Sequence, residues 1–203
     1  WLFSATMPKG VAKIAKSYME DPIEVTIGSK NIGAENIHHV YFHVNERERN
    51  QAVKRILDFH PNIYGLIFCR TRRTTQDIAD KLLKDGYNAA PLHGDLSQMQ
   101  RDKAMEKFRE KTLQILVATD VAARGIDVDN ISHVINYHLP DDIESYTHRS
   151  GRTARAGKKG VSIAIVSNKD QNKVFQIEKK IKIKFDVGKL PSGKEICEQQ
   201  LVG

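Results

Sequence analysis

The chain alternates between short apolar runs and segments in which apolar residues recur every three or four positions. The apolar runs, several of them rich in β-branched residues, predict strands over 37–44, 64–69, 88–92, 113–118, 133–138 and 160–166. Helical spacing between these runs predicts helices over 47–59, 72–85, 97–110, 141–150 and 169–180. This regular alternation predicts an α/β fold in which helices cover both faces of a parallel sheet.

Two of the predicted helices start with a capping-box pattern, in which a short polar side chain is followed three residues later by Glu or Gln. Ser97 precedes Gln100 in this way, and Asp141 precedes Glu144, with Asp in place of Ser or Thr. The two helices are therefore expected to be capped by Ser97 and Asp141.

The two ends of the chain are less regular than its middle. An apolar stripe predicts a short helix over 9–20, and alternation predicts a strand over 23–27. Residues 28–36 contain two glycines and mostly polar side chains, which is typical of a linker. The last segment, 189–203, is polar, with helical spacing over 192–201.

Composition narrows the class of protein. A chain of 203 residues with 40% hydrophobic residues can form the core of one domain with appendages. It contains neither an apolar run of the roughly 20 residues that span a membrane nor a signal peptide. Because it starts with Trp1 and not with Met, we expect a piece of a longer protein, and its sparse cysteines favour the cytoplasm. The cysteines, Cys69 and Cys197, have no metal-ligand spacing and are expected to be reduced thiols, with no metal site.

Positive charge is concentrated in one segment of this basic chain. The formal net charge is +7, which favours an anionic partner, nucleic acid above all. Residues 148–159 contain five Arg or Lys and no Asp or Glu, and Arg149, Arg152 and Arg155 follow one another at a spacing of three. The planar arginine fork suits phosphate oxygens. Taken alone, the segment could also be a solvated basic face.

Several polar residues come directly after predicted strands. Arg70 follows one strand, Gly94 lies just after a second, and Thr119 and Asp120 follow a third. Ligands of parallel α/β sheets bind beyond the carboxyl ends of the strands. These residues are therefore expected to gather at one edge of the sheet and to form a binding site there.

Five motifs resemble, in chain order, motifs III, IV, IVa, V and VI of the DEAD-box RNA helicases. They are Ser4-Ala5-Thr6, residues 66–69, His93-Gly94-Asp95 with Gln98 and Arg101, residues 118–127, and residues 148–157. Together they cover roughly residues 4–166. The resemblance implies a RecA-like parallel sheet sandwiched by helices, namely the second of the two RecA-like domains of a helicase.

The resemblance also implies a domain organisation. Residues 1–30 look like the tail of the first RecA-like domain, including motif III, and 31–36 are the linker. Residues 37–188 would form the second RecA-like domain, and 189–203 the start of a C-terminal extension. The sequence has no phosphate-binding loop and no acidic box, which belong to the first domain together with the Mg²⁺ ligands. This chain by itself is therefore expected to have no ATPase activity.

By resemblance, one set of residues serves ATP and the contact between the domains. Arg152 and Arg155 would be arginine fingers that reach the γ-phosphate, and Gly125 and Asp127 would contact the nucleotide. His148, Ser4 and Thr6 would couple the two domains. The residue types also leave structural roles open: an ion-pair partner for either arginine, a packed histidine, and a loop cap for Asp127.

A second set would contact RNA: Arg70, Gly94, Gln98, Arg101 and Thr119. None of these residues is aromatic, so the resemblance implies contacts with phosphates and 2′-hydroxyls that do not depend on base sequence. For Arg70, a solvated charge at a strand end is the alternative. The expected function is thus the C-terminal half of an ATP-dependent RNA helicase that uses ATP and Mg²⁺. Another superfamily 2 helicase or translocase acting on DNA, and a non-catalytic nucleic-acid-binding module, are the alternatives.

Overall fold

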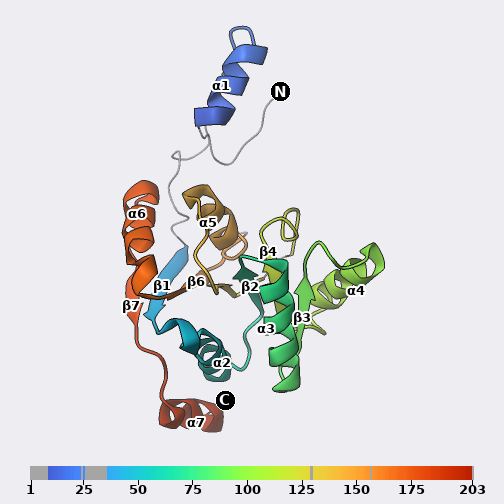
Figure 1. Cartoon of the computed structure of the whole chain (residues 1–203), viewed down its shortest axis with the longest axis vertical. Coiled ribbons are helices and arrows are strands. Elements are labelled where there is room, and N and C mark those ends of the chain that lie inside the picture. The colour runs from blue at the N-terminus through green and yellow to red at the C-terminus, as the bar shows by residue number, and fades with distance from the viewer. Residues whose placement is uncertain (1–8, 24, 26–35, 129, 156, 203) are drawn as a thin grey trace.

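The computed structural model describes residues 9–23, 25, 36–128, 130–155 and 157–202, and its described strands form one parallel sheet (Figure 1). The strand order is β3-β4-β2-β5-β6-β1-β7. The strands are β1 (Ile37–His43), β2 (Gly65–Cys69), β3 (Ala89–Leu92), β4 (Ile115–Thr119), β5 (His133–Asn136), β6 (Gly160–Val166) and β7 (Asp186–Gly188). The predicted parallel sheet is confirmed.

Helices cover both faces of this sheet, as predicted. Helices α2 (Arg49–Phe59) and α3 (Arg72–Lys84) pack on one face, against residues such as Ile67 and Val117. The other face is covered by α4 (Gln98–Arg109), α5 (Ile143–Ser150) and α6 (Gln171–Ile181). Two 3₁₀ turns, η1 (Glu46–Glu48) and η2 (Asn168–Asp170), precede α2 and α6.

The burial of the central strands explains why their sequences are apolar. Every residue of β2 and of β4 is buried, because each strand packs against helices on both faces. Side chains of neighbouring residues in β2 point to opposite faces, so Ile67 joins the core under α2 and α3 whereas Leu66 and Phe68 join the core under α4. A continuous apolar run is the pattern expected of such a strand.

One of the two predicted helix caps is correct and the other is wrong by one residue. Ser97 caps α4: its hydroxyl accepts the backbone N–H of Gln100 at 3.3 Å, and the Gln100 side chain accepts the Ser97 N–H at 2.9 Å. Helix α5 is capped by Asp142, which accepts the N–H of Ser145 at 2.7 Å. Asp141 is thereby left free to form ion pairs.

The ends of the chain confirm two helices and add a strand. In helix α1 (Lys9–Tyr18), the apolar side chains of Ile14 and Tyr18 are exposed. The predicted C-terminal helix is α7 (Gly193–Val202), whose Gln200 donates to the Asp58 carbonyl at 3.3 Å. Strand β7, which pairs with β1, was not predicted. Most of the strand predicted over 23–27, most of the linker and motif III lie outside the described residues.

The sequence predicted no membrane-spanning segment and two reduced cysteines. Among the helices that the structure describes, none combines the length and the apolar character needed to cross a bilayer. Cys69 is buried and Cys197 is exposed, and both are free thiols.

Three histidines inside the layered body should make stability depend on pH. His39 is buried, and its Nδ1 lies 2.7 Å from the hydroxyl of Tyr146, whereas its Nε2 has no partner among the described residues. Burial lowers the pKa of His39, His133 and His138 to about 4 in each case. The unfolded chain binds these protons near pH 6.5, and the folded protein binds them only near pH 4.

The free energy of unfolding should therefore fall as the pH drops from 6.5 towards 4, by at most about 1.4 kcal/mol per pH unit for His39 and for His133, and by less for the more exposed His138. Urea denaturation of this chain at pH 7.5, 6 and 5 measures the effect. His39→Gln, which keeps an amide near Tyr146, should reduce the pH dependence. Ser162→Ala is the control, because it removes a contact of Tyr146 but no titrating group. Equal pH slopes for His39→Gln and the unaltered chain would rule out His39 as a source.

Candidate functional site at the carboxyl edge of the sheet

The segments that follow β2, β3, β4 and β5 meet at one edge of the sheet. All four strands are parallel and neighbouring, so their carboxyl ends point the same way. Arg70 follows β2, Gly94 follows β3, Thr119 ends β4 and Asp120 follows it. The expected gathering of these residues at one edge is thus confirmed.

Arg149 is buried at this edge and connects three strand ends to α5. Its Nε and Nη2 bind the two carboxylate oxygens of Asp120 at 2.6 and 2.7 Å. Its Nη1 donates to Asn136 Oδ1 at 3.0 Å and to the carbonyl oxygen of His138 at 2.7 Å. The guanidinium also lies over the ring of Phe68, 5.0 Å from its centroid. Because its side chain is buried and donates four hydrogen bonds to these partners, the first of the three spaced arginines is part of the fold.

The other two arginines lie against the loop that follows β4. Arg152 donates from Nη1 to the carbonyl oxygen of Ile126 at 2.9 Å. Arg155 donates to the Gly151 carbonyl at 3.2 Å, and its Nη1 lies 2.7 Å from a carboxylate oxygen of Asp127. Burial and, next, the charge of Arg155 lower the pKa of Arg152. An anion beside these two guanidiniums would therefore be stabilised by both.

A hollow of about 320 Å³ opens beside these arginines. It is lined by Phe68, Asp120, Ala123, Arg124, Gly125, Ser145, His148, Arg149 and Arg152. Three residues predicted from the sequence, Gly125, His148 and Arg152, thus line one hollow. Gly125 has a φ of +76°, a conformation that glycine adopts without strain. Ser4 and Thr6, the predicted coupling partners of His148, lie outside the described residues.

Gly94 has a neighbour that the sequence reasoning missed. A Cβ atom at position 94 would lie 3.3 Å from Cζ of Arg72, so the glycine lets this guanidinium lie close to the backbone. Arg72 also forms an ion pair with Asp95 at 2.7 Å. The basic pair Arg72-Arg73, just after β2, is the signal in the sequence that could have identified it.

The remaining predicted RNA contacts are distributed along the edge. Gln98 donates to Asp102 at 2.7 Å, and Arg101 is half-buried in the first turns of α4. Thr119 is buried, and its hydroxyl accepts the N–H of Ala122 at 3.4 Å. Arg70 donates to the carbonyl of Leu139 at 3.4 Å. None of these residues lines the hollow that contains His148 and Arg152.

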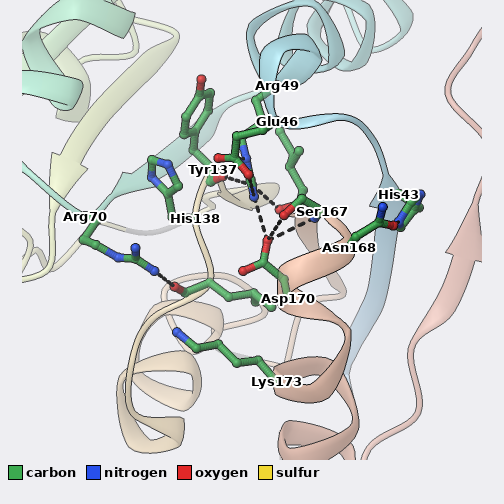
Figure 2. A network of polar contacts seen from close by, with 12 residues as sticks. His43, Glu46, Arg49, Arg70, Tyr137, His138, Ser167, Asn168, Asp170 and Lys173 are labelled. Atoms are coloured by element: carbon green, nitrogen blue, oxygen red, sulfur yellow. Dashed lines mark hydrogen bonds and ion pairs between the residues drawn. The ribbon is translucent and has the colours of Figure 1, made fainter.

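A second buried arginine, also missed, fixes the neighbouring strand ends (Figure 2). Arg49 donates to the carbonyl oxygens of Tyr137 and Ile165, which follow β5 and lie in β6. It also binds Glu46 at 2.9 Å and Asp170 at 2.6 Å. Hydrogen bonds, from Arg49 to Glu46 and from Ser167 and Arg49 to Asp170, lower the pKa of both carboxylates against the effect of burial. Only the spacing of Glu46 and Arg49 hints at this network in the sequence.

The described residues contain no cluster of side chains that could bind a metal ion. Across the described ranges, no three His, Cys, Asp or Glu side chains lie close enough together to hold a metal ion. The cationic side chains of the edge are instead suited to anions.

Comparison with known proteins identifies the family. Residues 48–157 match the helicase conserved C-terminal domain. The DEAD-box ATP-dependent RNA helicase CshA of Bacillus subtilis is 40% identical over 98% of this chain, and the match covers 40% of that protein. This chain thus spans about two fifths of the length of the curated relatives that it matches.

Two solved structures extend the likeness to the fold. A DEAD box protein from Methanococcus jannaschii is 46% identical, with a TM-score of 0.72 over 92% of this chain and 50% of the other. Dbp5 of S. cerevisiae bound to RNA and ADP BeF3 is 30% identical, with a TM-score of 0.86 over 98% of this chain and 53% of the other. Sequence, sheet topology and these matches agree: the chain belongs to the helicase conserved C-terminal domain family and is a RecA-like domain of the DEAD-box group.

Proposed function

We propose that this chain is the C-terminal half of an ATP-dependent RNA helicase, and that it supplies arginine fingers and part of the RNA-binding surface. The observation that carries the proposal is the contact of Arg155 with Asp127 at 2.7 Å, beside the hollow lined by Arg152, Gly125 and His148. Motif VI, which contains the candidate fingers, and motif V, which contains the candidate nucleotide contact, thus meet at one place.

The residues around this hollow fit a nucleoside triphosphate. Arg152 and Arg155 are two neighbouring cations. Burial and the charge of Arg155 lower the pKa of Arg152, and Asp127 offsets this only in part, so a bound phosphate would stabilise both charges. The Asp127 side chain is 90% exposed and can accept hydrogen bonds from ribose hydroxyls. When bound, ATP would supply the phosphoanhydride bond that is hydrolysed, and the Mg²⁺ ligands would come from the first RecA-like domain.

The proposed role of the two arginines is to stabilise charge. Closure of the two domains would bring their guanidiniums to the γ-phosphate, where negative charge is present in the transition state. His148 would couple this movement to motif III of the other domain. Because the phosphate-binding loop would belong to that domain, the chain alone would not hydrolyse ATP.

RNA would bind farther along the same edge. The backbone N–H of Gly94 can approach a phosphate closely, and Arg101 can add a charge-assisted hydrogen bond. Arg70, Gln98 and Thr119 would complete the surface. Contacts of this kind read the backbone and not the bases, so binding would be indifferent to sequence.

Arg101→Ala in the complete helicase tests the RNA surface. It should weaken the binding of single-stranded RNA about equally for every sequence, and it should lower the salt slope by roughly one phosphate contact. Fluorescence anisotropy with two unrelated 12-nucleotide RNAs, at several salt concentrations, measures both effects. Arg109→Ala removes the same charge from the other end of α4 and is the control. An equal loss in both variants, or a loss for one RNA only, would contradict the proposed surface.

A further inference from the structure

We infer that Lys173 is an additional contact for the RNA backbone, and that Asp141 is an internal counter-ion which an RNA phosphate displaces. The inference rests on the proposed function, because it extends the proposed RNA surface beyond Arg70. None of the motifs that carried the family resemblance contains Lys173 or Asp141. The inference comes from the contacts that the two side chains make in the folded chain.

Asp141 is shared by two cations that lie far apart in the sequence. Its Oδ1 is 2.8 Å from Nζ of Lys173 and 3.4 Å from Nη2 of Arg70. The Asp141 side chain is 75% exposed, and those of Arg70 and Lys173 are 48% and 32% exposed. One carboxylate therefore opposes two positive charges in a place that solvent and ligands can reach.

Asp141 is ionised at neutral pH in this arrangement. The hydrogen bond from Lys173 and the nearby charge of Arg70 lower its pKa, whereas its slight burial acts in the opposite direction. A phosphate carries the same sign of charge and offers more acceptor oxygens, so it can replace this carboxylate between the two cations.

The position of the cluster continues the proposed RNA surface in strand order. The sheet runs β3-β4-β2-β5-β6, and neighbouring strands are about 4.8 Å apart. Gly94, Thr119 and Arg70 lie at the carboxyl ends of β3, β4 and β2. Asp141 comes from the segment after β5, and Lys173 from the first turn of α6, which follows β6. With Lys173, the row of cationic side chains at the carboxyl edge of the sheet would continue from β2 past β5 to β6.

The fold does not require the Lys173–Asp141 ion pair. The adjacent strand ends are already held by buried Arg49, through Tyr137, Glu46 and Asp170 (Figure 2). Figure 2 also shows the long side chains of Arg70 and Lys173 outside that buried centre. An exposed ion pair contributes little to stability. Its components are therefore available for binding.

RNA binding by Lys173→Ala and Asp141→Asn variants of the complete helicase tests the inference. Single-stranded 12-nucleotide RNAs are the probes. Lys173→Ala should weaken binding about three- to tenfold and reduce the salt slope by roughly one phosphate contact. Asp141→Asn should act in the opposite direction and strengthen binding about two- to fivefold, because it removes the competing charge. Lys179→Ala, at the other end of α6, should change neither quantity.

The outcomes separate this inference from the proposed function. If Arg101→Ala weakens RNA binding but Lys173→Ala does not, the inference is wrong and the proposed surface stands. If neither variant has an effect, the RNA surface itself is misassigned. Weaker binding by Asp141→Asn would also overturn the inference, because Asp141 would then support the RNA contact. Thermal unfolding of each variant must match the unaltered protein for the comparison to count, and Lys173→Gln is a substitute if Lys173→Ala unfolds.

Discussion

Replacing Arg155 by lysine in the complete helicase should lower RNA-stimulated ATP turnover about a thousand-fold. Lysine keeps the positive charge but lacks the planar fork that binds phosphate oxygens in pairs. RNA affinity measured without nucleotide should barely change, because Arg155 lies beside Asp127 and not among the proposed RNA contacts. Steady-state ATPase assays and anisotropy on the same samples measure the two effects.

Arg101→Ala provides the reciprocal comparison, since its main effect is expected on RNA affinity. The assignment would be reversed if Arg155→Lys abolished RNA binding in the absence of nucleotide while turnover at saturating RNA survived. In that case, residues 148–159 would be an RNA-binding patch and not a catalytic edge.

Arg149→Ala should destabilise the domain by about 3 kcal/mol. The substitution leaves Asp120, Asn136 and the carbonyl of His138 without their charged donor, and it empties the space over Phe68. The partial exposure of the Asp120 side chain keeps the loss towards the lower end of the range for broken buried ion pairs. Urea denaturation of residues 1–203 measures the change.

Arg155→Ala is the matched control for this measurement. Its partner Asp127 is 90% exposed, so its loss should change the free energy of unfolding by no more than about 0.5 kcal/mol. Combining Arg149→Met with Asp120→Asn should recover part of the stability, because no buried charge is then left unpaired. Equal destabilisation by Arg149→Ala and Arg155→Ala would show that burial does not distinguish the two arginines.

Most strands and helices were predictable because each shows one simple hydrophobic pattern over enough residues. Strand β2, buried on both faces, is a continuous apolar run, and α4 starts at a complete capping box. Strand β7 has three residues, too few to display an alternation. Asp141 was mistaken for the cap of α5 because Asp142 follows it, and sequence alone does not say which carboxylate turns towards the helix.

The motifs named three residues that line the hollow, Gly125, His148 and Arg152, but the spacing of the arginines did not show which of them is buried. Arg149, Arg152 and Arg155 are equally spaced, yet only Arg149 is buried against Phe68 and Asp120. That difference depends on contacts with strands far away in the sequence. Arg49 was missed for the same reason, since its partners Tyr137 and Asp170 are brought close only by the folded sheet.

The strand order has a consequence for solubility. Of the strands that the structure describes, only β3 and β7 lie at the borders of the sheet, where unpaired backbone groups could recruit a strand from another molecule. Strand β7 offers just three residues, and β3 contains Pro91, which has no N–H to donate. Both borders are thus poor templates for strand addition. We expect the domain to resist edge-to-edge aggregation although its central strands are among the most apolar parts of the chain.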